Sequence, residues 1–168
     1  TPMNGIIGMT GLLLDTELSG EQRQYAETVR GCGEALLTLI NDILDFSKIE
    51  AGKLVFETLE FDLLSVIEDV QAVLGVKAQA KGVELGIFVD PTTPLQVAGD
   101  PTRLRQILTN LMDNALKFTQ EGSVEVRVRP EAQEDGHTLI RVEIKDTGIG
   151  MRPEVVDRLF TSFFQGDS

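Results

Sequence analysis

The sequence contains little of several residue types, and each shortage excludes a class of protein. Its 168 residues include one cysteine, one histidine and no tryptophan. A single cysteine, Cys32, excludes an internal disulfide and is typical of a reducing compartment. Cys32 lies on an apolar helical stripe, so we expect a small core residue rather than a reactive thiol. No apolar run approaches the roughly 20 residues that span a bilayer, and the first residues do not resemble a signal peptide.

Basic residues are also few: 15 Lys and Arg stand against 27 Asp and Glu, which gives a net charge of −12. This balance argues against non-specific binding to nucleic acid or to an anionic membrane, because both require a basic face. It does not exclude a phosphate ligand, since Mg²⁺ and backbone N–H groups can neutralise phosphates. We therefore expect no nucleic-acid or direct membrane contact, and the lack of a long apolar run predicts a soluble chain.

The first third of the sequence predicts a helical hairpin. Apolar residues recur at helical spacing over 1–15, and Ser19-Gly20-Glu21-Gln22 has the form of a capping box that starts a second helix. Ala51-Gly52-Lys53 ends that helix. A heptad seam of about three repeats runs along it. The seam comprises Tyr25, Val29, Cys32, Leu36, Leu39, Ile43 and Phe46.

Further apolar residues at Leu37, Ile40 and Leu44 widen this stripe beyond the seam of a two-stranded coiled coil. A wide stripe favours a four-helix bundle. Because one hairpin supplies only two helices, we expect a homodimer.

Beyond the hairpin, the periodicity indicates a second domain that mixes helices and strands. Asp100 followed by Pro101 is the expected start of one helix, with Asp100 as its N-cap. Val124, Val126 and Val128 alternate with other residues, as in a strand with one buried face. The expected elements are helices at 62–81 and 101–117 and strands at 83–89, 123–129 and 139–144. Their order indicates an α+β sandwich with helices on one face of a sheet.

The expected helix at 101–118 has a polar and an apolar face. Asn110 and Asn114 lie one turn apart on the polar face, although Asn is unfavourable inside a helix. A carboxamide oxygen suits Mg²⁺, and Lys117 one turn further can meet a phosphate. The alternative is a polar face with two incidental asparagines, which the spacing alone favours. The polar face also holds Arg103, and the apolar face comprises Leu104, Leu108, Leu111, Ala115 and Phe118.

A second segment, Asp146-Thr147-Gly148-Ile149-Gly150, directly follows an expected strand. An Asp at a strand end can accept a hydrogen bond from the exocyclic amine of adenine, and glycines let the backbone approach a purine closely. The alternative is a simple turn.

Together, these segments resemble the motifs of sensor histidine kinases, in order and spacing, over essentially the whole chain. Residues 110–119 resemble the N box, residues 146–150 the G1 box, and residues 159–165 the F box of that family. Residues 1–8 look like the segment that follows the phosphoacceptor in the H box. Residues 41–53 resemble the end of the second hairpin helix, especially in hybrid kinases, which carry a fused receiver domain.

The resemblance implies a dimerisation and histidine-phosphotransfer hairpin at 1–54 and a catalytic ATP-binding domain of the histidine kinase and GHKL type at 55–168. The implied cofactors are ATP and Mg²⁺. Asn114 would be the main Mg²⁺ ligand with Asn110 nearby, Lys117 would contact the phosphates, and Asp146 would select adenine. The implied nucleotide-binding residues are Asn110, Asn114, Lys117, Phe118, Asp146, Gly148, Ile149 and Gly150. Gly148 and Gly150 would also open a mobile lid, anchored by Phe160, Phe163 and Phe164; the alternative for these phenylalanines is plain core packing.

Two departures from the family pattern affect these implications. The family places its phosphoacceptor His four residues before the Thr of Thr-Pro, so that His would lie upstream of Thr1. Thr1 would then orient a water for dephosphorylation; the alternative is that it merely precedes the helix-bending Pro2. His137, beside an expected Asp135-Gly136 turn, is expected to be an incidental surface residue. The sequence also ends before the G2 box that closes the lid.

The resemblance leads to one main hypothesis and two alternatives. The main one is a protein histidine kinase of a two-component phosphorelay, which phosphorylates a hairpin His for transfer to a response-regulator receiver domain, fused or separate. The enzymatic alternative is an ATPase of the same fold. Such ATPases carry a Glu at the position of Asn110 to activate water, and a carboxamide cannot act as a general base, so Asn110 argues against hydrolysis. The non-enzymatic alternative is a degenerate kinase used as a dimerisation scaffold, against which the intact N and G1 boxes argue. The fragment would be cytoplasmic, or the cytoplasmic part of a membrane-anchored sensor.

Overall fold

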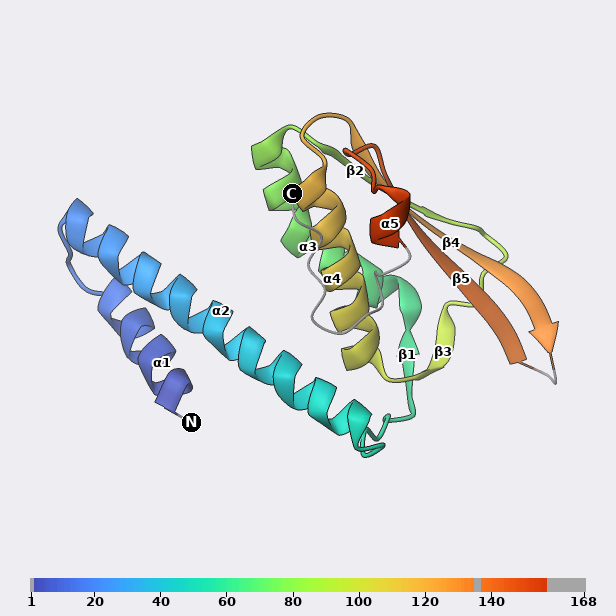
Figure 1. The fold of residues 1–168 in the computed structure, drawn as a ribbon, viewed down its shortest axis with the longest axis horizontal. Coiled ribbons are helices and arrows are strands. Elements are labelled where there is room, and N and C mark those ends of the chain that lie inside the picture. The colour runs from blue at the N-terminus through green and yellow to red at the C-terminus, as the bar shows by residue number, and fades with distance from the viewer. Residues whose placement is uncertain (1, 135–136, 157–168) are drawn as a thin grey trace. The chain divides into compact units, whose positions relative to one another are not determined.

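The computed structural model describes residues 2–134 and 137–156 (Figure 1). The chain divides into two compact units, Thr1–Val55 and Phe56–Ser168, which are described separately. The structural boundary thus lies between residues 55 and 56, whereas the sequence predicted it between residues 54 and 55. Thr1 and the lid residues Phe160, Phe163 and Phe164 lie outside the described residues, as does the Asp135-Gly136 turn.

The first unit is the expected hairpin of α1 (Pro2–Leu14) and α2 (Gly20–Glu50) (Figure 1). The predicted capping box is present at the start of α2. Ser19 Oγ accepts from the Gln22 backbone N–H at 3.2 Å, and Gln22 Oε1 accepts from the Ser19 N–H at 3.0 Å. The helix ends at Glu50 with Ala51 as its C-cap, and Gly52 follows in the left-handed region with φ 61°, where glycine is favoured. The sequence therefore encodes both ends of α2 locally.

Small residues of α2 form the face on which α1 packs. Ala26 and Gly33 are buried, and a Cβ added to Gly33 would lie only 3.2 Å from Ile7 Cγ1. Arg23 ties the two helices together at the loop, because its guanidinium donates to the Leu14 carbonyl at 3.1 Å. The heptad seam lies on another part of α2, where Leu39 is 58% exposed. The packing of α1 thus leaves most of the seam exposed within one chain, namely Tyr25, Val29, Cys32, Leu36, Leu39 and Ile43.

Cys32 requires a correction. It was expected to be a small core residue, but in this chain its side chain is exposed. The reason is that the seam on which it lies is not the face of α2 that α1 covers.

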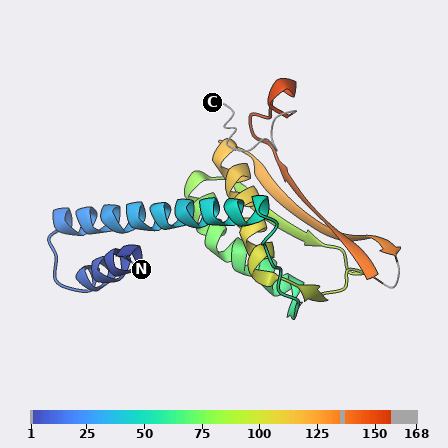
Figure 2. The same ribbon diagram turned by 60° about the horizontal axis from the view of Figure 1, so that its bottom comes forward.

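The second unit consists of a mixed sheet covered by two helices. Strand β4 (Ser123–Glu134) pairs in parallel with β2 (Glu84–Val89) and antiparallel with β5 (His137–Asp146). Helices α3 (Leu63–Lys81) and α4 (Pro101–Phe118) cover one face of this sheet (Figure 2). The predicted helices and strands are therefore present, with β4 and β5 longer than expected. The remaining elements are β1 (Leu59–Asp62), β3 (Gln96–Gly99) and α5 (Pro153–Val156).

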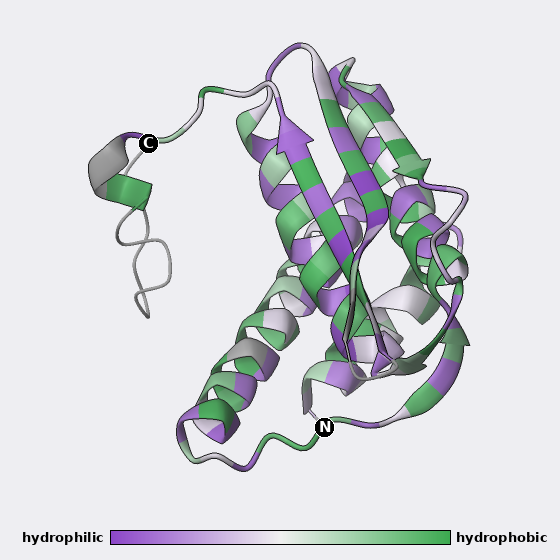
Figure 3. Cartoon of the chain, turned by 90° about the vertical axis from the view of Figure 1, so that its right-hand side faces the viewer, coloured by the Kyte–Doolittle hydropathy of each residue, from purple (hydrophilic) through white to green (hydrophobic). Residues whose placement is uncertain are grey.

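The core lies between the helices and the sheet. Val124, Val126 and Val128 of β4 are buried, as the alternation predicted, and hydrophobic and hydrophilic residues alternate visibly along the long strands in Figure 3. These valines pack with one face of α3 and one face of α4 in a single cluster. The side chains that α3 contributes to it are Leu63, Val66, Ile67, Val70, Leu74 and Ala78.

The apolar face predicted for α4 is partly wrong. Leu104, Leu108 and Ala115 face the core as expected, but Leu111 is 51% exposed, whereas Met112 is fully buried. Phe118 is also exposed, and Leu116 is buried in its place. Leu111 and Met112 are the i+3 and i+4 neighbours of Leu108, and both lie next to it on the helix surface. The sequence alone therefore does not decide which of the two side chains is buried in the core.

Strands β1 and β3 were not predicted. They form a separate two-stranded antiparallel sheet, in which Phe61 pairs with Val97, and both side chains pack against the core. Each strand is four residues long and leads into a capped helix. Asp62 Oδ1 accepts from Ser65 N at 3.1 Å, and Asp100 Oδ1 accepts from Arg103 N at 3.0 Å. The Arg103 backbone N–H also holds the pKa of the Asp100 carboxyl below its usual range.

Helices α3 and α4 run parallel, side by side (Figures 1 and 2). Arg105 pairs with Asp69 at 2.7 Å, and Lys77 pairs with Asp113 two turns further along, in both cases with a separation of 36 residues. A constant separation requires that both helices advance in the same direction. Their C-terminal ends therefore meet at the same edge of the second unit.

We predict that Met112→Ala lowers the free energy of unfolding of the second unit by about 2–5 kcal/mol, because it leaves a cavity in the core. Leu111→Ala is the matched control one residue earlier, and it should cost much less because half of that side chain is already exposed. Denaturant unfolding followed by circular dichroism measures both variants. Equal losses would show that Leu111 packs in the core.

Candidate functional site

The polar face of α4 presents the predicted ligand residues to solvent. Asn110, Asn114 and Lys117 are all exposed. Within the described part of the chain, neither carboxamide makes a hydrogen bond to another residue. The Lys117 ammonium lies over the Phe118 ring, 5.1 Å from its centroid. Both carboxamide oxygens are therefore available to an external ligand. Arg103, grouped with these residues in the sequence, instead donates to Gln106 Oε1 at 2.9 Å.

The turn after β5 is docked on the C-terminal end of α4. The Ile149 backbone N–H donates to the Phe118 carbonyl at 3.3 Å. A Cβ added to Gly148 would lie 2.5 Å from Phe118 O and 2.9 Å from Asp146 Oδ1, which is too close for any real side chain. Glycine is therefore required here for the close approach of two backbones. This junction brings together Phe118, Asp146, Gly148 and Ile149, four of the predicted site residues.

The two carboxylate oxygens of Asp146 differ: one holds a turn, and the other has no hydrogen-bond partner among the described residues. Its Oδ1 accepts from the Gly148 backbone N–H at 2.9 Å, so the residue forms the turn that the alternative interpretation of the sequence predicted. Its side chain is exposed, and Oδ2 makes no hydrogen bond to any described residue. One carboxylate oxygen can therefore hold the turn while the other accepts from a ligand. Gly150 follows with φ 68°, in the left-handed region.

Sequence reasoning missed the residues that lock this turn to the start of β4. Ser123 N donates to Thr147 Oγ1 at 3.0 Å, and Thr147 N donates to Ser123 O at 3.1 Å. Gly122 has φ 111°, and a Cβ there would collide with the Thr147 side chain. The one local sign of this contact in the sequence is the Thr147 hydroxyl inside the Asp-x-Gly motif. Its partner, Ser123, lies 24 residues away, so no local pattern identifies it.

The exposed carboxamide oxygens of the site fit a hard cation that is also bound to the phosphates of a ligand. Among the described residues, no three His, Cys, Asp or Glu side chains gather to form a metal site. The oxygens of Asn110 and Asn114 are neutral hard ligands, which suit Mg²⁺ together with phosphate oxygens and water.

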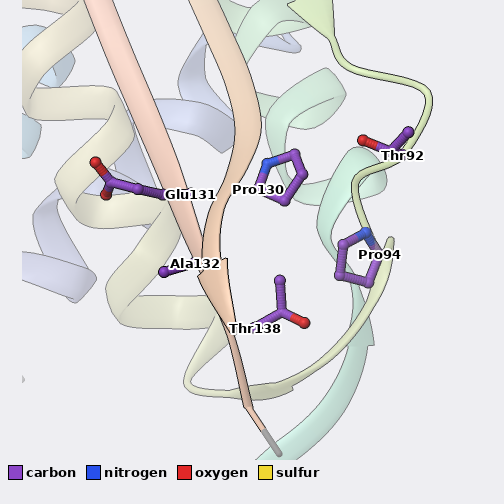
Figure 4. Close-up of a pocket in the computed structure, with 6 residues that line it drawn as sticks. All are labelled: Thr92, Pro94, Pro130, Glu131, Ala132 and Thr138. Atoms are coloured by element: carbon purple, nitrogen blue, oxygen red, sulfur yellow. The ribbon is translucent and has the colours of Figure 1, made fainter. Parts of the chain in front are cut away.

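A pocket of about 500 Å³ lies elsewhere in the second unit, between the loop after β2 and the β4–β5 hairpin (Figure 4). It contains none of the predicted site residues. His137, at the start of β5, is exposed, in agreement with the expected surface position. The residues that line the pocket are Thr92, Pro94, Pro130, Glu131, Ala132 and Thr138.

Two family profiles match the chain. The family described as "His Kinase A (phospho-acceptor) domain" matches residues 1–52, which include α1 and α2. The family described as "Histidine kinase-, DNA gyrase B-, and HSP90-like ATPase" matches residues 99–168, which include every residue of the α4–β5 junction. The chain belongs to the sensor histidine kinases.

Relatives within this kinase family span most of the chain. The sensor protein GacS of Pseudomonas syringae pv. syringae is 46% identical over 168 residues, which are 100% of this chain and 18% of GacS. Hybrid signal transduction histidine kinase L of Dictyostelium discoideum is 44% identical over 99% of this chain and 10% of its own length. Full-length ShkA in complex with AMPPNP has a TM-score of 0.71 and 35% identity, over 92% of this chain and 32% of ShkA.

The chain therefore spans less than a fifth of the length of these two curated kinases.

Among the residues whose structure is described, no helix combines the length and the apolarity that crossing a membrane requires.

We predict that Gly148→Ala destabilises the second unit by about 1–3 kcal/mol, because the new methyl group overpacks the junction against the Phe118 carbonyl. Gly75→Ala is the control: Gly75 lies inside α3 with open space around its Cα, and alanine favours a helix. Thermal unfolding should show a lower Tm for the first variant and an equal or higher Tm for the second. An unchanged Tm in Gly148→Ala would mean that the two backbones can separate without cost.

Proposed function

We propose that this chain is the catalytic core of a protein histidine kinase, which uses ATP and Mg²⁺ to phosphorylate a histidine of the hairpin region. The phosphoryl group would then pass to an aspartate of a response-regulator receiver domain. The observation that carries the proposal is the junction at which the turn after β5 meets the end of α4, because it joins Asp146 to the helix whose exposed face carries the two carboxamides. Family membership supports the reaction class.

Each site residue has a distinct proposed role. Asn114, with Asn110 nearby, would hold Mg²⁺, and Lys117 would bind the phosphates as a point charge. Asp146 would accept from the adenine amine through the oxygen that the turn leaves free. Gly148, Ile149 and Gly150 would line the base as part of the turn that docks on Phe118. Bound ATP would supply the phosphoryl group, and Mg²⁺ would offset part of its charge.

Asn110 supports transfer to a protein nucleophile over hydrolysis of ATP. ATPases of the same fold carry a glutamate at this position to activate water. A carboxamide has no useful basicity, so Asn110 cannot take a proton from water. The name of the related ShkA complex, which contains the ATP analogue AMPPNP, supports ATP as the nucleotide. The hybrid kinase among the relatives supports a receiver domain as the next acceptor.

The hairpin unit would dimerise through the seam of α2. Leu36, Leu39 and Ile43 are about half exposed in one chain, although α1 is already packed on α2. A contiguous apolar stripe of this length is unusual on a monomer and marks an interaction surface. A second copy would complete the four-helix bundle. Thr1, which was assigned a role in dephosphorylation, lies outside the described residues, and that role stays a prediction.

A degenerate kinase that serves only as a dimerisation scaffold is the alternative function. A scaffold would not require two exposed carboxamides on α4 without a hydrogen-bond partner among the described residues. Binding of ATP in the presence of Mg²⁺ separates the two functions, because only the kinase proposal requires it.

We predict that Asp146→Asn lowers the affinity for ATP roughly ten- to a hundredfold, the effect of losing one hydrogen bond to a charged group. Asparagine can still accept from the Gly148 N–H, but it presents an NH₂ donor where adenine needs an acceptor. Titration calorimetry with ATP and with GTP measures the effect, which should be much smaller for GTP. An equal loss for both nucleotides would show that Asp146 acts only through the turn.

We also predict that the protein is a homodimer and that Leu39→Glu converts it to a monomer, because the change buries an unpaired charge in the seam. Thr38→Glu is the matched control, since Thr38 is exposed and is not part of the seam. It should leave the dimer intact. Light scattering gives the mass of each protein. A monomeric mass for the unmodified protein would contradict the proposed assembly.

A further inference from the structure

A lysine of α3 contacts the last carbonyls of α4. Lys81 lies in the last turn of α3, and its ammonium donates to Leu116 O at 2.6 Å and to Thr119 O at 3.1 Å. A third, longer contact reaches Lys117 O at 3.4 Å. All three acceptors are backbone carbonyls at the C-terminal end of the helix that carries the candidate site. A lysine ammonium has three donors, so it can serve all of them.

The parallel arrangement of the two helices explains why a cation is needed there. The last carbonyls of a helix have no partner within the helix, and they give its C-terminal end a partial negative charge. Because α3 and α4 run in the same direction, two such ends lie side by side. The Lys81 ammonium lies at this shared end and offsets both charges, while it satisfies the unpaired carbonyls of α4.

The same contact fixes the backbone on both sides of Phe118. Lys81 binds the carbonyls of Lys117 and Thr119, the two neighbours of Phe118 in the chain. The Phe118 carbonyl itself accepts from Ile149 N in the turn that contains Asp146 and Gly148. The position of that turn therefore depends on a backbone segment that Lys81 holds from the other side.

We propose that Lys81 is a positioning residue for the nucleotide site: it holds the C-terminal end of α4 so that the Phe118 carbonyl can dock the Asp146–Gly150 turn. The inference rests on the proposed function for its effect on ATP. Its effect on the turn is independent of any ligand.

Lys77 offers a matched comparison on the same two helices. It lies one turn before Lys81 on α3 and pairs with the Asp113 carboxylate on α4. Both side chains of this pair are about half exposed, and the side-chain donor to the terminal carbonyls is Lys81, not Lys77. Loss of Lys77 therefore removes a contact between α3 and α4 without releasing the end of α4.

The experiment compares Lys81→Met, Lys81→Arg and Lys77→Met with the unmodified protein, at a temperature where all are folded. Two quantities are measured: amide hydrogen exchange at Ile149, and the Kd for ATP with Mg²⁺. Lys81→Met should speed exchange at Ile149 and raise the Kd roughly tenfold, the effect expected from losing contacts to a charged group. Lys77→Met should change neither quantity, even if it lowers the Tm. Lys81→Arg keeps the cation and should restore most of both.

The two measurements distinguish failure of this inference from failure of the proposed function. Unchanged exchange at Ile149 in Lys81→Met would overturn the positioning role, whatever the nucleotide does. Unchanged ATP affinity in Lys81→Met, with tight binding by the unmodified protein, would overturn its relevance to the site. An unmodified protein that binds no ATP would overturn the proposed function and with it the role of Lys81 in binding, while the exchange data still decide whether Lys81 holds the turn.

Discussion

The hydrogen bond from the Ile149 backbone N–H to the Phe118 carbonyl joins two segments that lie about thirty residues apart in the sequence, and the candidate site depends on it. One segment carries the carboxamides and Lys117, and the other carries Asp146. The contact is possible because residue 148 is glycine and because Thr147 ties the turn to the start of β4. Without this junction, the polar face of α4 and the turn after β5 would be two unrelated surface features.

The layers of the second unit hold both partners of this contact. Val124, Val126 and Val128 bind β4 to the helices, and β5 is paired with β4 along its length, so the end of β5 is fixed relative to α4. The parallel pairing of α3 with α4 then brings Lys81 to the other side of the same helix end. Burial in the core, which is non-directional, thus sets the distance at which a directional hydrogen bond can form.

The sequence predicts best what depends on near neighbours in the chain. The capping box at Ser19, the cap at Asp100 and the alternation in β4 follow from residues within a few positions of one another, and all are present. The choice between Leu111 and Met112 depends on where α3 and the sheet lie. The small sheet of β1 and β3, and the contacts of Thr147 and Lys81, depend on partners 24 or more residues away, so no local pattern could reveal them.

The central claim is that ATP binds where α4 and the turn after β5 meet. The most direct test is a ¹⁵N–¹H spectrum of the protein recorded during titration with ATP and Mg²⁺. The account predicts that the backbone signals of Gly148 and Ile149 and the side-chain amide of Asn114 shift together, while those of Ala132 and Thr138, in the pocket near the β4–β5 hairpin, stay unchanged. Shifts confined to Ala132 and Thr138, or no shifts at any of these residues, would contradict it.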